Sequence, residues 1–334
     1  MRAWQIPAFG IDSLELAERP DRKPGLGEIE VRVRAASFNY RDLLMVKGLY
    51  NPKLKLPRIP CSDGAGEVVA VGEGVTWWKP GDRVAGIFMQ NWIDGLGTPA
   101  KVKGALGGDI DGMLADAVIL HEAGLVAIPK HLSFAEAATL PCAAVTAWNA
   151  LVAASLKPGA TVLIQGTGGV SIFALQFARL IGMKVLGVSS SDEKLEHARA
   201  LGLHAGLNYR QTPEWDRWVL EQTDGEGVDL VVEVGGVGTL PRSLRAIRMG
   251  GTIAQIGVLS GPSEQLPLPV ILHKQTHIRG IYVGSRCDFE EMNACVALAG
   301  LRPVIESHPW TETREVLHRM EAGDHFGKLV VTID

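Results

Sequence analysis

The chain has 334 residues, which is more than one ordinary hydrophobic core accommodates and predicts two domains. Its formal net charge of −4 provides no basic field for a nucleic acid or an anionic membrane, so we expect neither as a partner. The four cysteines are scattered without a C-x-x-C pair, which argues against a disulfide framework and against a cysteine-rich structural zinc site.

The sequence carries no pattern of a membrane-spanning or exported protein. No uncharged apolar run is long enough for a transmembrane helix. The opening residues, MRAWQIPAFGIDSLEL, lack the apolar core of a signal peptide. We therefore expect a cytoplasmic protein.

The first part of the chain, to about residue 125, has the pattern of β-structure. Residues 28–39 (EIEVRVRAASFN) alternate polar and apolar side chains, as a half-buried strand does. Short apolar runs separated by Gly and Pro turns continue over residues 64–75, 79–87 and 116–129. Many short strands of this kind predict a barrel or a sandwich.

The pattern changes after residue 130. Residues 133–155 are Ala-rich with a helical period, and Ser133 with Glu136 forms a capping box at their start. Strands are then expected at 161–165, 184–190, 228–236 and 251–258, with helices at 170–182 and 192–202. This alternation predicts a parallel, doubly wound sheet. A strand at 277–284, a helix at 288–300 and a last strand at 327–334 follow, and the last strand resembles the first part of the chain.

A glycine-rich turn joins the strand at 161–165 to the helix at 170–182. Its first glycine permits the tight turn, its second lets the backbone approach a pyrophosphate, and the helix start offers free N–H groups. Ser171 stands at the third position of the fingerprint, where Gly or Ala is usual. An ordinary strand–helix turn is the alternative. We assign a dinucleotide site to Gly166, Thr167, Gly168, Gly169 and Val170.

The end of the second strand of this sheet bears on the choice of coenzyme. An NAD site usually has an acidic residue here, whereas this chain has Ser189, Ser190 and Ser191. Hydroxyls and a cation suit a 2′-phosphate, so NADP(H) is favoured, with Ser189, Ser190, Lys194 and Tyr209 as cofactor residues. Against this, Asp192 and Glu193 would repel a phosphate, and Ser190 with Glu193 is also a capping box.

Several segments together resemble the medium-chain dehydrogenase/reductase superfamily over essentially the whole chain: GAGEVVAVGEGV, KPGDRV, TLPCAAVTAW, GTGGVS and HFGKLVV. The resemblance implies an α/β protein in which residues 1–125 and 286–334 form a GroES-like β-barrel catalytic domain. Residues 126–285 would form a Rossmann domain with a doubly wound parallel sheet. It also implies a homodimer through the edge of the Rossmann sheet, around residues 277–284.

The resemblance also raises the question of zinc. Zinc alcohol dehydrogenases of this superfamily carry a Cys where this chain has Asn39, and a His-Glu pair where it has Ser62 and Asp63. Their third ligand position matches Cys142. A catalytic zinc needs three protein ligands, so we expect no metal. The four-Cys lobe for structural zinc is absent as well, and a Gly-rich loop over residues 92–112 takes its approximate place.

The zinc-independent quinone oxidoreductase and alcohol dehydrogenase-like branch is the better match. Its N-terminal signature resembles residues 39–42 and 47–50, which implies that Asn39 and Tyr50 face the nicotinamide and act in catalysis. Tyr40 and Trp92 are assigned to the substrate pocket, with simple packing as the alternative. By resemblance, further cofactor residues are Thr146, Gly257, Val258, Val283, Gly284, Phe326 and Lys328.

These features predict an NADP-dependent oxidoreductase that transfers hydride to a quinone or an α,β-unsaturated carbonyl without a metal. Without a metal, the carbonyl oxygen needs hydrogen-bond donors, which Asn39 and Tyr50 can supply. A zinc-independent alcohol dehydrogenase or ketone reductase is the alternative enzyme. A non-catalytic NADPH-binding protein is the alternative of another class, although an intact glycine loop argues against it.

Overall fold

The computed structural model describes residues 1–257 and 267–333. The chain forms two compact units, Thr146–Tyr282 as one, and Met1–Val145 with Val283–Asp334 as the other. We expected the boundaries after residues 125 and 285. The first lies later because α2 (Phe134–Ala137) packs on strands of the discontinuous unit, so the segment before Val145 belongs to that unit.

The discontinuous unit is built mainly of antiparallel strands. Its larger sheet runs in the order β14-β15-β3-β4-β5-β7, with β6 paired to β3, and β1 pairs with β2 in a separate ribbon. The strands are β1 (Arg2–Gln5), β2 (Glu15–Glu18), β3 (Glu28–Ser37), β4 (Asp63–Val71), β5 (Arg83–Gly86), β6 (Ala117–His121), β7 (Leu125–Ala127), β14 (Ile305–Pro309) and β15 (Lys328–Thr332).

The last strand completes the sheet of the first part of the chain, as its pattern predicted. β15 lies between β14 and β3, and Val330 pairs with Ser37 in an antiparallel register. The helices of this unit are α1 (Tyr40–Val46), α2, α9 (Arg286–Ala299) and α10 (Thr313–Ala322), with short turns η1 (Ile11–Ser13), η2 (Glu122–Gly124) and η4 (Trp310–Glu312).

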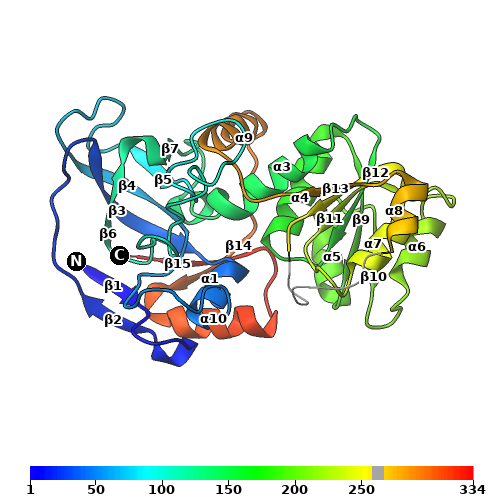
Figure 1. Ribbon diagram of the computed structural model, residues 1–334, viewed down its shortest axis with the longest axis horizontal. Coiled ribbons are helices and arrows are strands. Elements are labelled where there is room, and N and C mark those ends of the chain that lie inside the picture. The colour runs from blue at the N-terminus through cyan, green and yellow to red at the C-terminus, as the bar shows by residue number, and fades with distance from the viewer. Residues whose placement is uncertain (258–266, 334) are drawn as a thin grey trace. The chain divides into compact units, whose positions relative to one another are not determined.

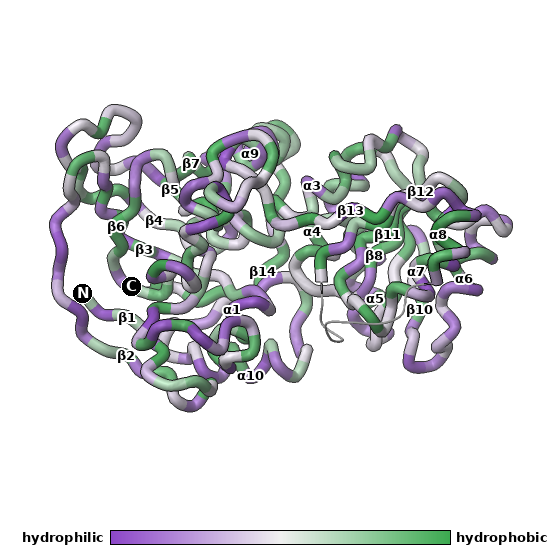
Figure 2. Tube along the Cα trace, viewed as in Figure 1, coloured by the Kyte–Doolittle hydropathy of each residue, from purple (hydrophilic) through white to green (hydrophobic). Residues whose placement is uncertain are grey.

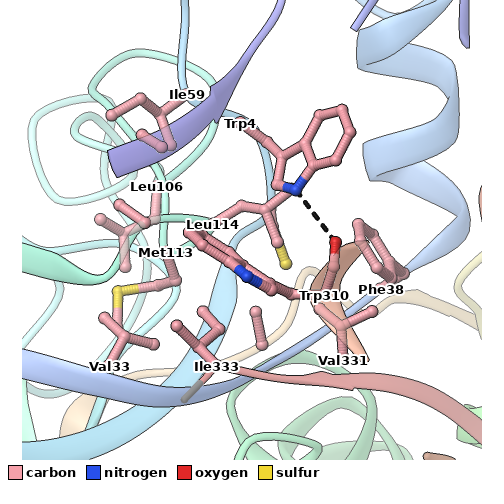
Figure 3. Close-up of a cluster of buried hydrophobic side chains, with 14 of the residues drawn as sticks. Trp4, Val33, Phe38, Ile59, Leu106, Met113, Leu114, Trp310, Val331 and Ile333 are labelled. Carbon is pink, nitrogen blue, oxygen red and sulfur yellow. Dashed lines mark hydrogen bonds between the residues drawn. The ribbon is translucent and has the colours of Figure 1, made fainter. Parts of the chain in front are cut away.

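The core of this unit joins residues from both ends of the chain. Figure 3 shows the indole of Trp4 donating a hydrogen bond to the backbone oxygen of Trp310, at 3.0 Å. Val33, Met113 and Ile333 lie in the same buried cluster. Burial of apolar surface contributes about 25 cal/mol per Å², so this shared core holds the two chain segments together.

The second unit is a parallel six-stranded sheet in the order β10-β9-β8-β11-β12-β13, which confirms the expected doubly wound arrangement. Its strands are β8 (Thr161–Gln165), β9 (Lys184–Ser189), β10 (Ala205–Asn208), β11 (Val228–Glu233), β12 (Ile247–Gln255) and β13 (His277–Gly280). Its helices are α3 (Val145–Ala153), α4 (Gly169–Ile181), α5 (Asp192–Ala200), α6 (Trp215–Glu221), α7 (Leu240–Ala246) and α8 (Leu268–Lys274).

Helices cover both faces of this sheet. Right-handed crossovers from β8 toward β10 place α4 and α5 on one face, and the connections from β10 toward β13 place α6, α7 and α8 on the other. Figure 1 shows α4 and α7 on opposite sides of the strands. Because helices cover both faces, β8 and β11 are buried along nearly their whole length.

The Ala-rich segment differs from the single helix that we expected over residues 133–155. Its capping box is present, since the Ser133 hydroxyl accepts from the Glu136 amide and the Glu136 carboxylate accepts from the Ser133 amide. After α2, however, the chain makes a π-helical turn, η3 (Leu140–Ala144), before α3. Pro141 lacks an N–H donor, which disfavours a regular helix at this point. None of the described helices is long and apolar enough to cross a lipid bilayer.

Candidate functional site

The first part of the candidate site lies where β3 ends and α1 begins. Asn39 precedes α1, and its backbone N–H donates to the Asp42 carboxylate at 2.9 Å. The other oxygen of Asp42 accepts from the Ser62 backbone N–H at 3.2 Å. Asp42 is fully buried, so its side chain joins the start of α1 to the segment that precedes β4. Asp42 also forms an ion pair with Arg41, at 3.4 Å.

Ser62 and Asp63 form a buried pair at the start of β4. The Ser62 hydroxyl donates to one Asp63 carboxylate oxygen at 2.8 Å, and the other oxygen accepts from the Cys142 backbone N–H at 3.1 Å. Cys61, just before them, has a φ of 73°, which is a left-handed conformation that a side chain with a Cβ adopts at a cost of about 1–3 kcal/mol. The surrounding hydrogen bonds offset this strain and fix the direction of the pair.

Lys328 reaches the same place from β15. The antiparallel register of β15 and β3 pairs Val330 with Ser37, and continuing it puts Lys328 opposite Asn39. The Lys328 ammonium donates to the backbone oxygen of Phe38 at 2.5 Å and to the side-chain oxygen of Asn39 at 2.6 Å. The residue is only 3% exposed, so its charge is held inside the unit.

These side chains form one polar network, which we call the 39–328 network: Asn39, Asp42, Ser62, Asp63 and Lys328. An ammonium only donates, so the oxygen of the Asn39 amide must face Lys328 and its nitrogen must face away. That nitrogen donates to the Ser62 hydroxyl at 3.2 Å. The donors therefore all point one way, from the Lys328 cation through Asn39 and Ser62 to the Asp63 carboxyl.

Burial controls the titration of the acidic groups here. It raises the pKa of Asp63 from 3.8 to about 6, a rise that the nearby Lys328 charge opposes. Burial likewise raises the pKa of Asp42, opposed by Arg41. The thiols of Cys61 and Cys142 also have raised pKa values because both are buried, and the carboxylates nearby act in the same direction.

The residues at the expected zinc positions do not make a zinc site. Asn39 and Ser62 are neutral groups that already bond to Lys328 and Asp63, and only Asp63 and Cys142 offer anionic ligand atoms. Catalytic zinc takes three protein ligands from imidazole, thiolate or carboxylate. Within the described ranges, no three His, Cys, Asp or Glu side chains gather in a way that could hold a metal ion.

Tyr50 lies apart from the network but is connected to it through Arg41. The Arg41 guanidinium lies over the Tyr50 ring at 5.7 Å and over the Phe88 ring at 4.9 Å, and it donates to the Leu106 backbone oxygen. Tyr50 is 44% exposed, and its hydroxyl makes no hydrogen bond within the described part of the chain. Asn39 and Tyr50, which we expected to act together, are thus positioned by separate contacts.

The two proposed pocket residues occupy different surroundings. Tyr40 opens α1 and is exposed. Trp92 is half-buried, and its indole N–H donates to the Gly95 backbone oxygen at 2.8 Å within the Gly-rich loop. The Trp92 backbone oxygen also accepts from the Arg286 N–H, so Trp92 stabilises this loop.

The glycine-rich turn has the geometry that a pyrophosphate site needs. Gly166 has a φ of 69°, and Gly168 caps α4. A Cβ added at either position would meet no protein atom within 4 Å, so the turn faces open space. The Ser171 hydroxyl donates to the Gln165 backbone oxygen at 2.6 Å, which holds the helix against the strand. Thr167, Gly169 and Val170 complete the turn and the first positions of α4.

A second buried network supports this turn and was not predicted. The Gln165 amide nitrogen donates to the Glu233 carboxylate and to the Ser243 hydroxyl, both at 2.8 Å. Glu233 also accepts from the backbone N–H groups of Gly235 and Gly236. The ends of β8 and β11 are thereby held together. Only the polar residue types at the ends of apolar strands could have indicated this network.

The residues expected to bind a 2′-phosphate lie at or after the carboxyl ends of β9 and β10. We call this group the rim: Ser189, Ser190, Lys194 and Tyr209. The Tyr209 backbone N–H donates to the Ser189 backbone oxygen at 2.9 Å. The helix cap is Ser191, whose hydroxyl accepts from the Lys194 N–H, so the capping box that we considered for Ser190 with Glu193 is wrong. Asp192 accepts from the side chains of Asn208 and Gln211, which engages its carboxylate within the protein.

The other expected cofactor residues lie in both units. Thr146 is buried in α3, and Gly257 lies so close to the Val234 backbone oxygen that a Cβ would overlap it. Val283 and Gly284 are buried before α9, and Val283 has a φ of 57°. The Phe326 N–H donates to Glu306 near the start of β15. Val258 lies outside the described residues.

Comparisons with known proteins agree with this architecture. A family model described as an alcohol dehydrogenase GroES-like domain matches residues 25–130, and one described as a zinc-binding dehydrogenase matches residues 169–298. A zinc-type alcohol dehydrogenase-like protein of Schizosaccharomyces pombe is 43% identical over 97% of this chain and 96% of its own. An acryloyl-coenzyme A reductase of Metallosphaera sedula is 33% identical over 95% of this chain and 96% of its own.

A solved structure shows the same fold. It is that of a candidate alcohol dehydrogenase from Sinorhizobium meliloti 1021, with a TM-score of 0.93 and 40% identity over 99% of this chain and 98% of the other. Together with the GroES-like unit and the doubly wound sheet, these matches show an oxidoreductase of a nucleotide-binding dehydrogenase family. The chain belongs to the medium-chain dehydrogenase/reductase superfamily.

Proposed function

We propose that this protein transfers a hydride from NADPH to an α,β-unsaturated carbonyl or a quinone, and that it does so without a metal ion. The observation that carries the proposal is the 39–328 network, which puts hydrogen-bond donors at positions where a zinc enzyme has ligands. The bound nicotinamide supplies the hydride, and the protein must then stabilise negative charge on the substrate oxygen.

Asn39 and Tyr50 are the donors that we assign to this task. When hydride adds to the β-carbon of an enone, the electron pair of the C=C bond moves toward the carbonyl oxygen and an enolate forms. The Asn39 amide N–H stabilises that oxygen, and the Tyr50 hydroxyl, or a water beside it, donates a proton to the α-carbon. The exposed Tyr50 hydroxyl has no competing hydrogen bond within the described residues, which supports this role.

The choice of NADPH rests on the rim of β9 and β10. Ser189, Ser190 and Lys194 follow one strand, and Tyr209 follows the next. No carboxylate stands at the end of β9 for a ribose 2′-hydroxyl, and Asp192 bonds to Asn208 and Gln211 instead. We therefore assign the 2′-phosphate of NADPH to the hydroxyl and cationic groups of this rim.

An alcohol dehydrogenase or ketone reductase that works without a metal is the second candidate. Alcohol dehydrogenase chemistry is favoured by the names of two of the reported relatives, the zinc-type S. pombe protein and the S. meliloti protein, and the absence of a metal is our own inference from the 39–328 network. The same donors would then stabilise an alkoxide, because the hydride would add to the carbonyl carbon.

We also infer a homodimer through β13. This strand ends the sheet, all four of its residues are exposed, and Tyr282 beside it is exposed as well. Leu268 and Leu272 of α8, the helix that precedes β13 along the chain, are 68% and 74% exposed, and Figure 2 shows the apolar character of this helix. Within the described ranges β13 pairs only with β12, and a free strand edge of this kind favours pairing with a second copy about a two-fold axis.

The deciding experiment is NADPH oxidation with a simple 2-alkenal, followed by identification of the product. We expect a saturated aldehyde, a higher kcat/KM with NADPH than with NADH, and full activity after dialysis against a chelator. Tyr50→Phe keeps the ring under Arg41 but removes the hydroxyl, and we expect roughly a tenfold to hundredfold loss of kcat. An unsaturated alcohol as product would transfer the assignment to the second candidate, and chelator inactivation would exclude the metal-independent mechanism.

A further inference from the structure

The strongest unexplained feature is a buried cation without an anionic partner in contact. Lys328 is 3% exposed, and among the described residues its ammonium makes two hydrogen bonds, both to neutral oxygens. No carboxylate lies within ion-pair distance of it there. A buried charge of this kind is costly, and proteins commonly retain one where it has a function.

Backbone pairing in the sheet of the discontinuous unit determines the position of this cation. Lys328 begins β15, a strand buried over most of its length between β14 and β3. The Phe38 N–H donates to the Leu329 backbone oxygen at 3.1 Å, so the β3–β15 pairing continues to the point where Lys328 meets Asn39. The ammonium is therefore fixed by backbone pairing as well as by its own hydrogen bonds.

Resting on the proposed function, we propose that Lys328 is a positioning residue that supplies, through Asn39, the positive charge that a zinc ion would otherwise supply. Its bond to the Asn39 oxygen fixes the direction of the amide and polarises the amide N–H groups. As negative charge develops on the substrate oxygen, a fixed cation in a low-dielectric interior stabilises it without having to reorganise.

The charges around Lys328 support an electrostatic role. Asp63 and Asp42 are the buried carboxyls of the network, and the Lys328 charge opposes the rise of the pKa of both. Arg41 lies beside Asp42, at 3.4 Å. Of these two cations, Arg41 forms an ion pair with Asp42, whereas Lys328 contacts Asn39.

The test separates charge from hydrogen bonding. Lys328→Gln keeps two N–H donors but removes the charge, whereas Lys328→Arg keeps the charge. We expect Lys328→Gln to lower kcat about a hundredfold with little change in the Kd for NADPH, and Lys328→Arg to recover most of the loss. Lys184→Gln is the matched control, because its ammonium also donates to a backbone oxygen, that of Gln222, and it should leave kcat unchanged.

A double-variant cycle tests whether Lys328 acts through Asn39. We expect Lys328→Gln combined with Asn39→Ala to be no slower than the slower single variant, since both remove the same interaction. Three results would each overturn the proposal. The double variant could lose kcat by the product of the two single losses, Lys328→Gln could keep its full kcat, or Lys328→Gln could raise only the Kd for NADPH. If the wild-type product is an unsaturated alcohol, only the proposed function fails. The kcat values of the same four proteins are then measured for carbonyl reduction, and they test the role of Lys328 there. No turnover of either kind would overturn both.

Discussion

At the scale of single residues, the two glycines of the nucleotide turn are distinguished by their backbone angles. Gly166 needs its left-handed φ of 69°, whereas Gly168 has an ordinary φ of −77° and open space beside it. A methyl group at Gly168 would thus occupy only the space that we assign to the pyrophosphate. A substitution at Gly168 can therefore test cofactor binding without straining the fold.

Gly168→Ala is therefore expected to leave the fold nearly intact while weakening NADPH binding. We expect a change of less than about 1 kcal/mol in the free energy of unfolding and roughly a tenfold or larger rise in the NADPH Kd. Denaturant unfolding and fluorescence titration measure the two quantities. Gly280→Ala, which also adds a methyl group in open space, should leave the NADPH Kd unchanged. Equal Kd values for both variants would show that the turn does not hold the phosphates.

Asp63 gives the protein a pH-dependent stability. Its pKa is raised from 3.8 to about 6, so between these values the folded protein holds a proton that the unfolded chain has lost. The free energy of unfolding consequently falls as the pH rises through this window, and the loss is complete above pH 6.

Asp63→Asn removes this titration, and we expect the stability of the wild type to fall relative to the variant by on the order of 3 kcal/mol between pH 4 and 7. Urea unfolding of both proteins across this range measures the difference. Asp324→Asn, at an exposed carboxyl, should run parallel to the wild type. Parallel curves for Asp63→Asn would show that burial does not perturb this group.

At the scale of elements, periodicity and glycine positions predicted the strands and helices that build the nucleotide unit. Strand β8, the turn and helix α4 ending on Gly182 follow the expected pattern, because a buried parallel strand is uniformly apolar and a left-handed helix end favours Gly. The short helices α6, α7 and α8 and the strands β1, β2, β10 and β14 were not predicted. Each of these strands has only four or five residues and each of these helices about two turns, too few for a period to emerge.

The candidate site was predicted as residue types but not as a network. Asn39 and Lys328 were both identified, but they lie 289 residues apart along the chain. Nothing in the sequence indicates the strand register that makes them neighbours. Likewise, Ser62 and Asp63 were noted only as lost zinc ligands. Their hydrogen bonds depend on the left-handed turn at Cys61 and on the π-helical turn that presents the Cys142 N–H, and neither follows from local pattern.

At the scale of the whole molecule, the exposed edge of β13 makes assembly testable. We expect Ile278→Lys to raise the dimer Kd on the order of tenfold or more, because a second copy would pack against this side chain. Light scattering over a concentration series measures the Kd. Val71→Lys is the matched control, since Val71 and Ile278 are both strand residues and are both 38% exposed. A monomeric wild type, or equal effects of the two substitutions, would contradict the proposed interface.

The split of the first unit across the chain has a consequence for biosynthesis. Residues 146–282 leave the ribosome as one continuous block, so the nucleotide unit can fold while translation continues. β14 and β15 emerge last, and with β15 comes Lys328. Until then the discontinuous unit lacks one of the strands that pair with β3, and it also lacks its internal cation. The hydrogen bond from Lys328 to Asn39 can therefore form only near the end of synthesis.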